Sequence, residues 1–194
     1  MKIVYIASGA AGMYCGMCLH DNTLAAAMIA AGEDVLLVPT YTPLRTDEAN
    51  VSKVPPMMYG GINVYLQQIS PIFNYTPRFL AKLLDSETLL NLVSKFASSV
   101  QAEKLGPLTV SMIAGRDGRQ AKELHKLIDW LKTEKPDVVH LSNSMLVGMA
   151  GPIRDACRVP VVCSLSGEDI FLEKRVPPYY EQARKLLKHK RQDA

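Results

Sequence analysis

Short apolar runs alternate with helix-forming stretches along this chain of 194 residues. The first two runs are KIVYIA, residues 2–7, and DVLLVP, residues 34–39, with a helical stretch near residues 21–31 between them. Runs rich in Val and Ile that end at turn residues are typical of buried strands. We therefore expect residues 2–39 to form a strand–helix–strand unit with parallel strands, and Asp21 or Asn22 to cap its helix.

A second unit of the same kind is expected towards the C-terminus. Residues 137–143, DVVHLSN, and residues 159–169, VPVVCSLSGED, are Val-rich runs that open into polar residues, and a helix-like segment separates them. Further helices are expected over about residues 107–135 and 178–191. This alternation predicts an α/β fold, a Rossmann-like parallel sheet flanked by helices, in a single domain that covers residues 1–194.

We expect residues 70–106 to form a helical insertion in this fold. Its first part, residues 72–84, mixes apolar side chains with Arg78 and Lys82, a combination that would suit contact with a membrane surface. Packing against the protein's own domain is the favoured interpretation. No apolar run is long enough to span a bilayer, so we expect a cytoplasmic protein, with association at the inner face of the membrane left open.

Composition excludes some classes of function. Apolar residues make up 48% of the chain and charged residues 21%, and the net charge is only +3, which argues against a broad nucleic-acid-binding face. The chain has four cysteines, and two of them lie in expected core elements, so a disulfide framework is not indicated. No set of residues has the spacing of a metal site, and we expect no metal.

The carboxyl ends of the expected strands carry the candidate site, because ligands bind there in open parallel sheets. Glu168 and Asp169 are the candidate catalytic residues, since a carboxylate at this edge can bind sugar hydroxyls or act as a base. His140 is as well explained by packing in the core as by a ligand. We expect the glycine loop after the first strand to share one groove with the ends of the two later strands. The candidate binding residues are Gly9, Gly12, Gly60, Gly61, His140, Asn143 and Ser166.

The segment YCGMC places Cys15 and Cys18 in the spacing of thiol–disulfide exchange enzymes, in which a helix N-terminus acidifies the first cysteine. Three points weigh against this interpretation. The motif follows the very first strand, the helix proper is expected to begin only after Cys18, and the chain is far longer than a bare thioredoxin-like module. A thiol–disulfide oxidoreductase therefore stands as an alternative function.

Several segments, in this order, resemble the N-terminal half of a family 4 glycosyltransferase, a retaining enzyme with the two-domain GT-B fold. They are the stretch from SGAAGMYCGMC to VPTYTPL, then YGGINVYLQQ, KPDVVHLSNSMLVGMAGPIRDACRVPVV and CSLSGEDIFLEK. The resemblance implies transfer of a sugar from a nucleotide-sugar donor to a hydroxyl of a small-molecule, glycan or lipid-linked acceptor. It implies no other cofactor.

The resemblance also assigns roles to residues. Gly9 to Gly12, or Gly60 and Gly61, would face the cleft near the donor phosphates. His140 and Asn143 would line the acceptor pocket, and Ser166, Glu168 and Asp169 would line its floor. Ser166 stands where many members of the family have histidine.

The family's second half, a C-terminal donor-binding domain, is absent from this sequence and would be the partner of the chain, which is expected to be inactive alone. The pair Glu173 and Glu181 matches the family's Glu-x7-Glu by spacing, but Pro177 and Pro178 between them are expected to put the two glutamates in different elements. A stand-alone module that binds carbohydrate or a lipid headgroup remains the second alternative function.

Overall fold

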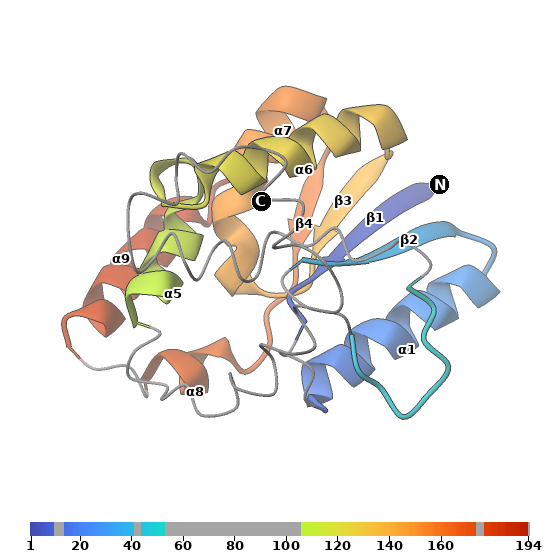
Figure 1. Cartoon of the computed structure of the whole chain (residues 1–194), viewed down its shortest axis with the longest axis horizontal. Helices are drawn as coiled ribbons and strands as arrows, with labels where there is room; N and C mark the ends of the chain where they lie inside the picture. The colour runs from blue at the N-terminus through green and yellow to red at the C-terminus, as the bar shows by residue number, and fades with distance from the viewer. Residues whose placement is uncertain (10–13, 41–43, 53–105, 174–176, 194) are drawn as a thin grey trace, which may run out of the picture.

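A four-stranded parallel sheet forms the centre of the protein (Figure 1). The computed structural model describes residues 1–9, 14–40, 44–52, 106–173 and 177–193. Within them the strands are β1 (Lys2–Ala7), β2 (Asp34–Pro39), β3 (Val138–Leu141) and β4 (Val161–Cys163), in the spatial order β2-β1-β3-β4. This arrangement confirms the expected α/β fold, a parallel sheet with flanking helices that is consistent with a Rossmann-like fold.

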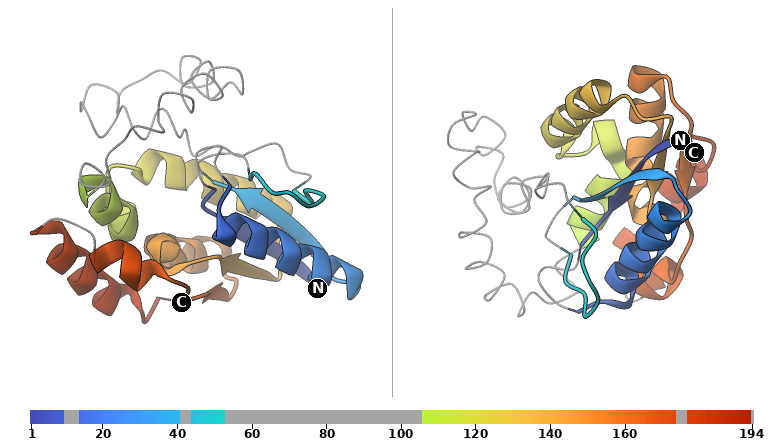
Figure 2. Two further views of the ribbon diagram at one scale, coloured as in Figure 1. Left: turned by 90° about the horizontal axis from the view of Figure 1, so that it is seen from below. Right: turned by 90° about the vertical axis from the view of Figure 1, so that its right-hand side faces the viewer.

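Helices cover both faces of the sheet because the chain leaves β1 in two directions. It moves from β1 to β2 on one side and reaches β3 and β4 on the other, and right-handed crossovers then place the connecting helices on opposite faces. Figure 2 shows α1 (Gly16–Ala30) and α6 (Ala121–Glu134) on the two sides of the sheet. The order of the strands reverses between β1 and β3, so this is where a ligand crevice is expected.

Strand β1, one of the two interior strands, is almost wholly buried, since both of its faces are covered. Successive side chains of β1 point to opposite faces. Val4 and Ile6 join a large apolar core with α6 and α7 (Ala150–Cys157), whereas Tyr5 and Ala7 join a smaller core beneath α1. This burial explains why the strand is a continuous apolar run and does not alternate with polar residues.

The helix-like segment expected between the two C-terminal Val-rich runs is divided in two. It begins as a 3-10 helix, η4 (Ser144–Met149), and continues as α7. Gly148 of η4 lies directly against the carbonyl oxygens of Met112 and Ile113 in α5 (Gly106–Ala114), where a side chain would not fit. A short 3-10 turn, η3 (Gly115–Asp117), then leads towards α6, so the helical stretch expected over residues 107–135 is divided at Gly115.

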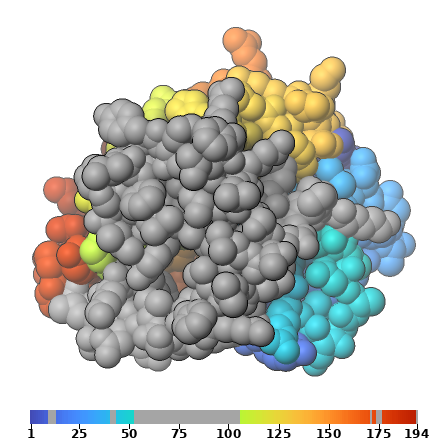
Figure 3. All heavy atoms as spheres, viewed as in Figure 1, coloured from blue at the N-terminus to red at the C-terminus, as the bar shows by residue number. Residues whose placement is uncertain are grey.

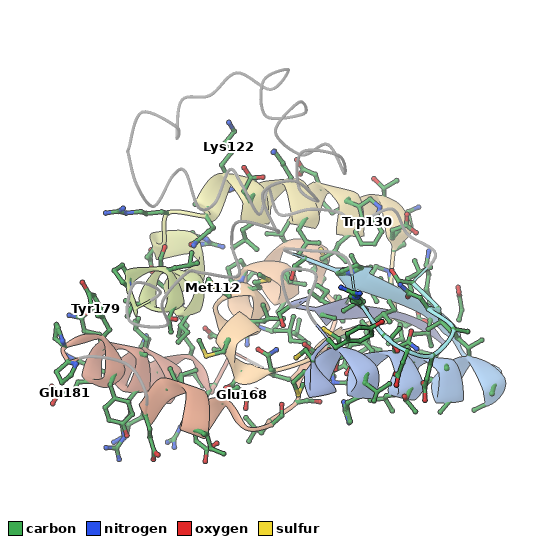
Figure 4. All side chains as sticks on the ribbon, turned by 60° about the horizontal axis from the view of Figure 1, so that its bottom comes forward. Met112, Lys122, Trp130, Glu168, Tyr179 and Glu181 are labelled. Atoms are coloured by element: carbon green, nitrogen blue, oxygen red, sulfur yellow. The ribbon has the colours of Figure 1, made fainter. Side chains whose placement is uncertain are left out.

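The C-terminal helices are α8 (Glu168–Glu173) and α9 (Tyr179–Lys190). Tyr179, labelled in Figure 4, packs its ring against Gly106 at the start of α5. Arg154 of α7 donates a hydrogen bond to the carbonyl oxygen of Asp193 at 3.0 Å, beyond the end of α9. Glu173 and Glu181 lie in different helices, as their separation by two prolines predicts.

The expected start of α1 is wrong. The helix begins at Gly16, not near residue 21, and Asp21 and Asn22 are buried within it. The Asn22 side chain donates to the carbonyl oxygen of Ala49 at 3.1 Å and accepts from the Val51 amide at 3.0 Å. Residues 44–52 are therefore held against α1, beside which they lie in cyan in Figure 3. Asp21 accepts a hydrogen bond from Tyr5, and Asn22 bonds to residues 49 and 51, so neither side chain caps the helix.

The helical insertion expected over residues 70–106 lies outside the described residues, apart from Gly106 at the start of α5. Across the ranges that the structure describes, no helix combines the length and the apolar character needed to cross a bilayer.

Candidate functional site

Polar side chains from two neighbouring strand ends meet where the strand order reverses. Ser8 follows β1, and Ser142 and Asn143 follow β3. The Asn143 amide nitrogen donates to the Ser142 hydroxyl at 3.1 Å and lies 3.3 Å from the Ser8 hydroxyl. Its amide oxygen accepts from the Met145 backbone N–H at 3.1 Å and so caps η4. Asn143 is thus held in one orientation at the carboxyl-terminal edge of the sheet. We call this edge, with Ser8, Ser142 and Asn143, the rim.

A buried carboxylate lies beneath this rim, on the face covered by α1. Asp21 is only 1% exposed, and its Oδ1 accepts a hydrogen bond of 2.7 Å from the Tyr5 hydroxyl. The Ser142 hydroxyl also bonds to this carboxylate, and Nδ1 of the exposed His20 lies 3.4 Å away. Burial raises the pKa of Asp21, and these hydrogen bonds oppose the rise. Asp21 therefore connects the solvent-facing His20 to the polar groups at the strand ends.

His140 is built into the same network from β3. Its ring stacks on Tyr5 with the centroids 4.2 Å apart and the planes 3° from parallel, and its Nε2 lies 2.7 Å from the Ser164 hydroxyl. Burial lowers the pKa of His140, which favours the neutral imidazole. This geometry supports the packed-histidine interpretation, and a direct contact between His140 and a ligand stays a prediction.

Glu168 joins the loop after β4 to the loop after β3. One carboxylate oxygen accepts from the Ser144 amide at 2.8 Å, and the other accepts from the Ser166 amide at 2.7 Å. Glu168 is the first residue of α8 and is labelled in Figure 4, close to η4. Both oxygens are occupied, so the geometry supports a positioning role for this residue. Its exposed neighbour Asp169 has its carboxylate at the helix surface.

The first turn of α1 reaches the same rim. The Ser166 hydroxyl donates to the Met17 sulfur at 2.9 Å, which ties the loop after β4 to the start of α1. Gly9 has a φ of 73°, a left-handed conformation that favours glycine, where the chain turns away from β1.

Asn143 and Glu168 share one rim, as expected. Of the other candidate glycines, Gly12, Gly60 and Gly61 lie outside the described residues.

A cavity of about 400 Å³ lies beside this first turn. The Arg45 guanidinium sits 4.4 Å above the centre of the Tyr14 ring at its edge. The described residues that line the cavity are Tyr14, Cys15, Gly16, Leu19, Arg45, Thr46 and Asp47.

Sequence reasoning missed several residues of this network, above all the buried pair Tyr5 and Asp21. Tyr5 looks like one more apolar residue of a buried strand, and Asp21 is of a residue type typical of helix caps. A signal was available along β1, because Tyr5 is the one side chain with a polar group among the apolar residues 3–7, and such a group must be satisfied when it is buried.

Comparisons with known proteins identify no family for this chain. Neither a protein-family model, nor a curated protein, nor a solved structure matches the chain. Within the described residues, no three His, Cys, Asp or Glu side chains gather in a way that could hold a metal ion. Any assignment of function to this rim therefore rests on its residues, their geometry and the family resemblance of the sequence segments.

Proposed function

We propose that this chain is the acceptor-side domain of a retaining glycosyltransferase of family 4. The observation that carries the proposal is the meeting of Ser8, Ser142 and Asn143 at the reversal of strand order between β1 and β3. Crevices of this kind bind ligands in open parallel sheets. Hydroxyl and amide groups can both donate and accept hydrogen bonds, which suits the hydroxyls of a sugar or another polyol.

The rim offers distinct groups to an acceptor and to a donor. Asn143 would orient the acceptor, and the exposed carboxylate of Asp169 would accept the proton of the attacking hydroxyl. Glu168 would keep the two loops in register, as its bonds to the Ser144 and Ser166 amides suggest. The N-terminus of α1, which has no acidic residue in its first turn, would favour the phosphates of a nucleotide-sugar donor.

In this proposal the complete reaction needs a second, donor-binding domain as the partner. Sugar would pass from the nucleotide to the acceptor hydroxyl with its anomeric configuration retained, and the departing diphosphate would be stabilised electrostatically. The acceptor is a small molecule, a glycan or a lipid-linked hydroxyl, and a lipid-linked acceptor would bring the domain to the inner face of a membrane from the cytoplasm.

Binding to the isolated chain tests the acceptor assignment. Saturation-transfer NMR with a panel of mono- and disaccharides should show transfer to a subset of these sugars. The Asn143→Ala variant should weaken that binding roughly tenfold, because it removes the amide that holds the Ser8 and Ser142 hydroxyls in place, and a hydrogen bond of this kind is worth about 1–2 kcal/mol. Asn50→Ala is the matched control and should bind as the unchanged chain does, because this exposed asparagine bonds within its own loop, at Leu44 and Ser52.

Two outcomes would contradict the proposal. One is the absence of any saccharide binding, and the other is equal weakening by both asparagine variants. Binding that persists without sugar transfer, when labelled nucleotide sugars and any further domain encoded by the same gene are present, would instead favour a stand-alone carbohydrate-binding module. In an active enzyme, Asp169→Asn should lower the rate of transfer, and unchanged acceptor kinetics would remove Asp169 from the site.

A further inference from the structure

Cys15 and Cys18 lie on the first turn of α1. Cys15 is the residue before the helix, with φ −142° and ψ 133°, and Cys18 follows one turn later. Residues three apart on a helix are neighbours on its surface, so the two thiols face each other closely enough for Cys15 to raise the pKa of Cys18. Because α1 begins at Gly16, the expectation that the helix starts only after Cys18 is wrong. One of the three arguments against thiol chemistry at this motif is thereby removed.

The two cysteines are placed unequally. Cys15 is half-buried and lines the cavity of about 400 Å³, whereas Cys18 is 2% exposed and packs in the core beneath α1. Burial and the neighbouring Cys15 together raise the pKa of Cys18 to about 12. Cys15 is therefore the accessible sulfur of the pair, and Cys18 is a protonated thiol held behind it.

Cys15 lies at the N-terminal end of α1. The positive end of the helix dipole stabilises negative charge at the start of a helix, and the first turn of α1 contains no acidic residue to cancel it. Arg45 and Asp47 bring one charge of each sign to the cavity wall. The backbone N–H of Arg45 also donates to the Cys18 sulfur, so that residues 44–52 contact the pair directly.

We propose that Cys15 and Cys18 form a redox-active dithiol that exchanges with small disulfides entering the cavity beside α1. The Cys15 thiolate attacks one sulfur of a disulfide RS–SR, forming a Cys15–SR mixed disulfide and releasing RS⁻. Cys18 then loses its proton to solvent and attacks the Cys15 sulfur, which closes the Cys15–Cys18 disulfide and releases a second RS⁻. The chain loses two electrons, and RS–SR is reduced to two thiolates.

Formation of the mixed disulfide would itself prepare the second step. Burial, the main cause of the raised pKa of Cys18, remains in the mixed disulfide, but once Cys15 carries an SR group it has no negative charge to oppose deprotonation of Cys18. The buried thiol then becomes a better attacking group at the moment when it is required. This site adjoins the rim, because Met17 lies between the two cysteines and accepts a hydrogen bond from Ser166. Its chemistry does not depend on the proposed glycosyltransferase function.

The other two cysteines lack this arrangement. Cys163 donates to the carbonyl oxygen of Asn143 at 3.4 Å, and burial raises its pKa to about 11. Cys157 lies on α7, where burial raises the pKa of its thiol. All four cysteines carry free thiols, and among them only Cys15 and Cys18 lie within one helical turn of each other. Cys157 and Cys163 therefore serve as internal controls.

The test equilibrates the reduced chain with mixtures of reduced and oxidised glutathione, alkylates the remaining thiols with N-ethylmaleimide, and maps the products by peptide mass spectrometry. The expected result is the loss of two alkylatable thiols and a peptide pair joined through Cys15 and Cys18. Cys18→Ser should accumulate glutathione on Cys15. Cys15→Ser should lower the rate of reaction with glutathione disulfide roughly tenfold or more, since the accessible thiol is gone.

The double variant Cys157→Ser/Cys163→Ser keeps the proposed pair and guards against unfolding of the single variants. It should form the same disulfide at the same glutathione ratio as the unchanged chain. Failure of the folded double variant to form an intramolecular disulfide in oxidised glutathione would overturn the proposal. Preferential glutathione attachment at Cys157 or Cys163 in the unchanged chain would also overturn it.

Discussion

The two faces of the sheet bury side chains to a similar degree but by different means. Beneath α6 and α7 the buried groups of β1 are Val4 and Ile6, packed against leucines of α6 such as Leu131. Beneath α1 the same strand presents Tyr5, which is as fully buried as its neighbours but is hydrogen-bonded to Asp21. One face is thus held by apolar contact, and the other holds a polar network inside its core.

The two faces of the sheet therefore have different roles: one stabilises the fold, and the other positions polar groups. Apolar burial is non-directional, so the face beneath α6 can stabilise the sheet without fixing the orientation of any one group. Hydrogen bonds are directional, and a buried polar group without a partner is costly. The face beneath α1 therefore requires a particular geometry of Tyr5, Asp21 and Ser142, and that geometry continues to Asn143 at the strand ends.

The largest effect is expected from a change on the apolar face. Leu131→Ala should lower the free energy of unfolding by about 2–5 kcal/mol, because it leaves a cavity in a core where the leucine is fully buried. Urea denaturation measures this loss. Leu165→Ala, at a leucine that is 82% exposed, should change stability by no more than about 0.5 kcal/mol. Equal losses in both variants would show that the face beneath α6 is not the apolar support described here.

A smaller loss is expected on the polar face. Tyr5→Phe should cost about 1–3 kcal/mol in urea denaturation, because it keeps the ring but removes the hydroxyl that donates to the buried Asp21. Tyr14→Phe removes a hydroxyl from a tyrosine that is 63% exposed and should leave stability nearly unchanged. If Tyr5→Phe were neutral, the hydrogen bond to Asp21 would contribute nothing, and the contrast between the two faces would disappear.

The smallest effect concerns pH. Burial lowers the pKa of His140, so below its ordinary value of about 6.5 the unfolded chain binds more protons at this residue than the folded one does. The stabilisation is complete above that pH and is lost as the pH falls through the lowered folded value. His140→Phe keeps a ring stacked on Tyr5 but cannot be protonated, so it should flatten this part of the curve.

Thermal unfolding between pH 7 and pH 5 measures that slope. Asp21 acts with the opposite sign, because its pKa is raised by burial and its contribution to stability falls as the pH rises above the ordinary value for aspartate. His125→Phe, at an exposed histidine on α6, is the matched control. An unchanged slope in His140→Phe would mean that His140 is protonated as readily in the folded protein as in the unfolded chain.

Much of the fold was predictable because it depends on local patterns. The apolar runs at residues 2–7 and 34–39 form adjacent parallel strands, and the helix from Ala121 to Glu134 ends just before Pro136. The start of α1 was not predictable in the same way. Asp21 and Asn22 are good capping residues in isolation, but their side chains have partners on β1 and in residues 44–52 that a local pattern does not contain.

The candidate site divides along the same line. Parallel strands bring their carboxyl ends to one edge, so the neighbourhood of Asn143 and Glu168 could be expected before any coordinates were known. The bonds from Glu168 to two backbone amides could not be expected, because they depend on how the loops after β3 and β4 fold back towards each other.

The sequence alone determined the layered α/β architecture and the edge of the sheet at which polar residues gather. These follow from the period of apolar positions and from the handedness of crossover connections, which operate over short stretches of chain. Tertiary structure alone decided which polar groups pair, that Asp21 is buried under Tyr5, and that Cys15 is accessible while Cys18 is not. Those outcomes depend on the rotation of α1 about its axis and on how it docks on the sheet. Contacts between residues far apart in the sequence determine both.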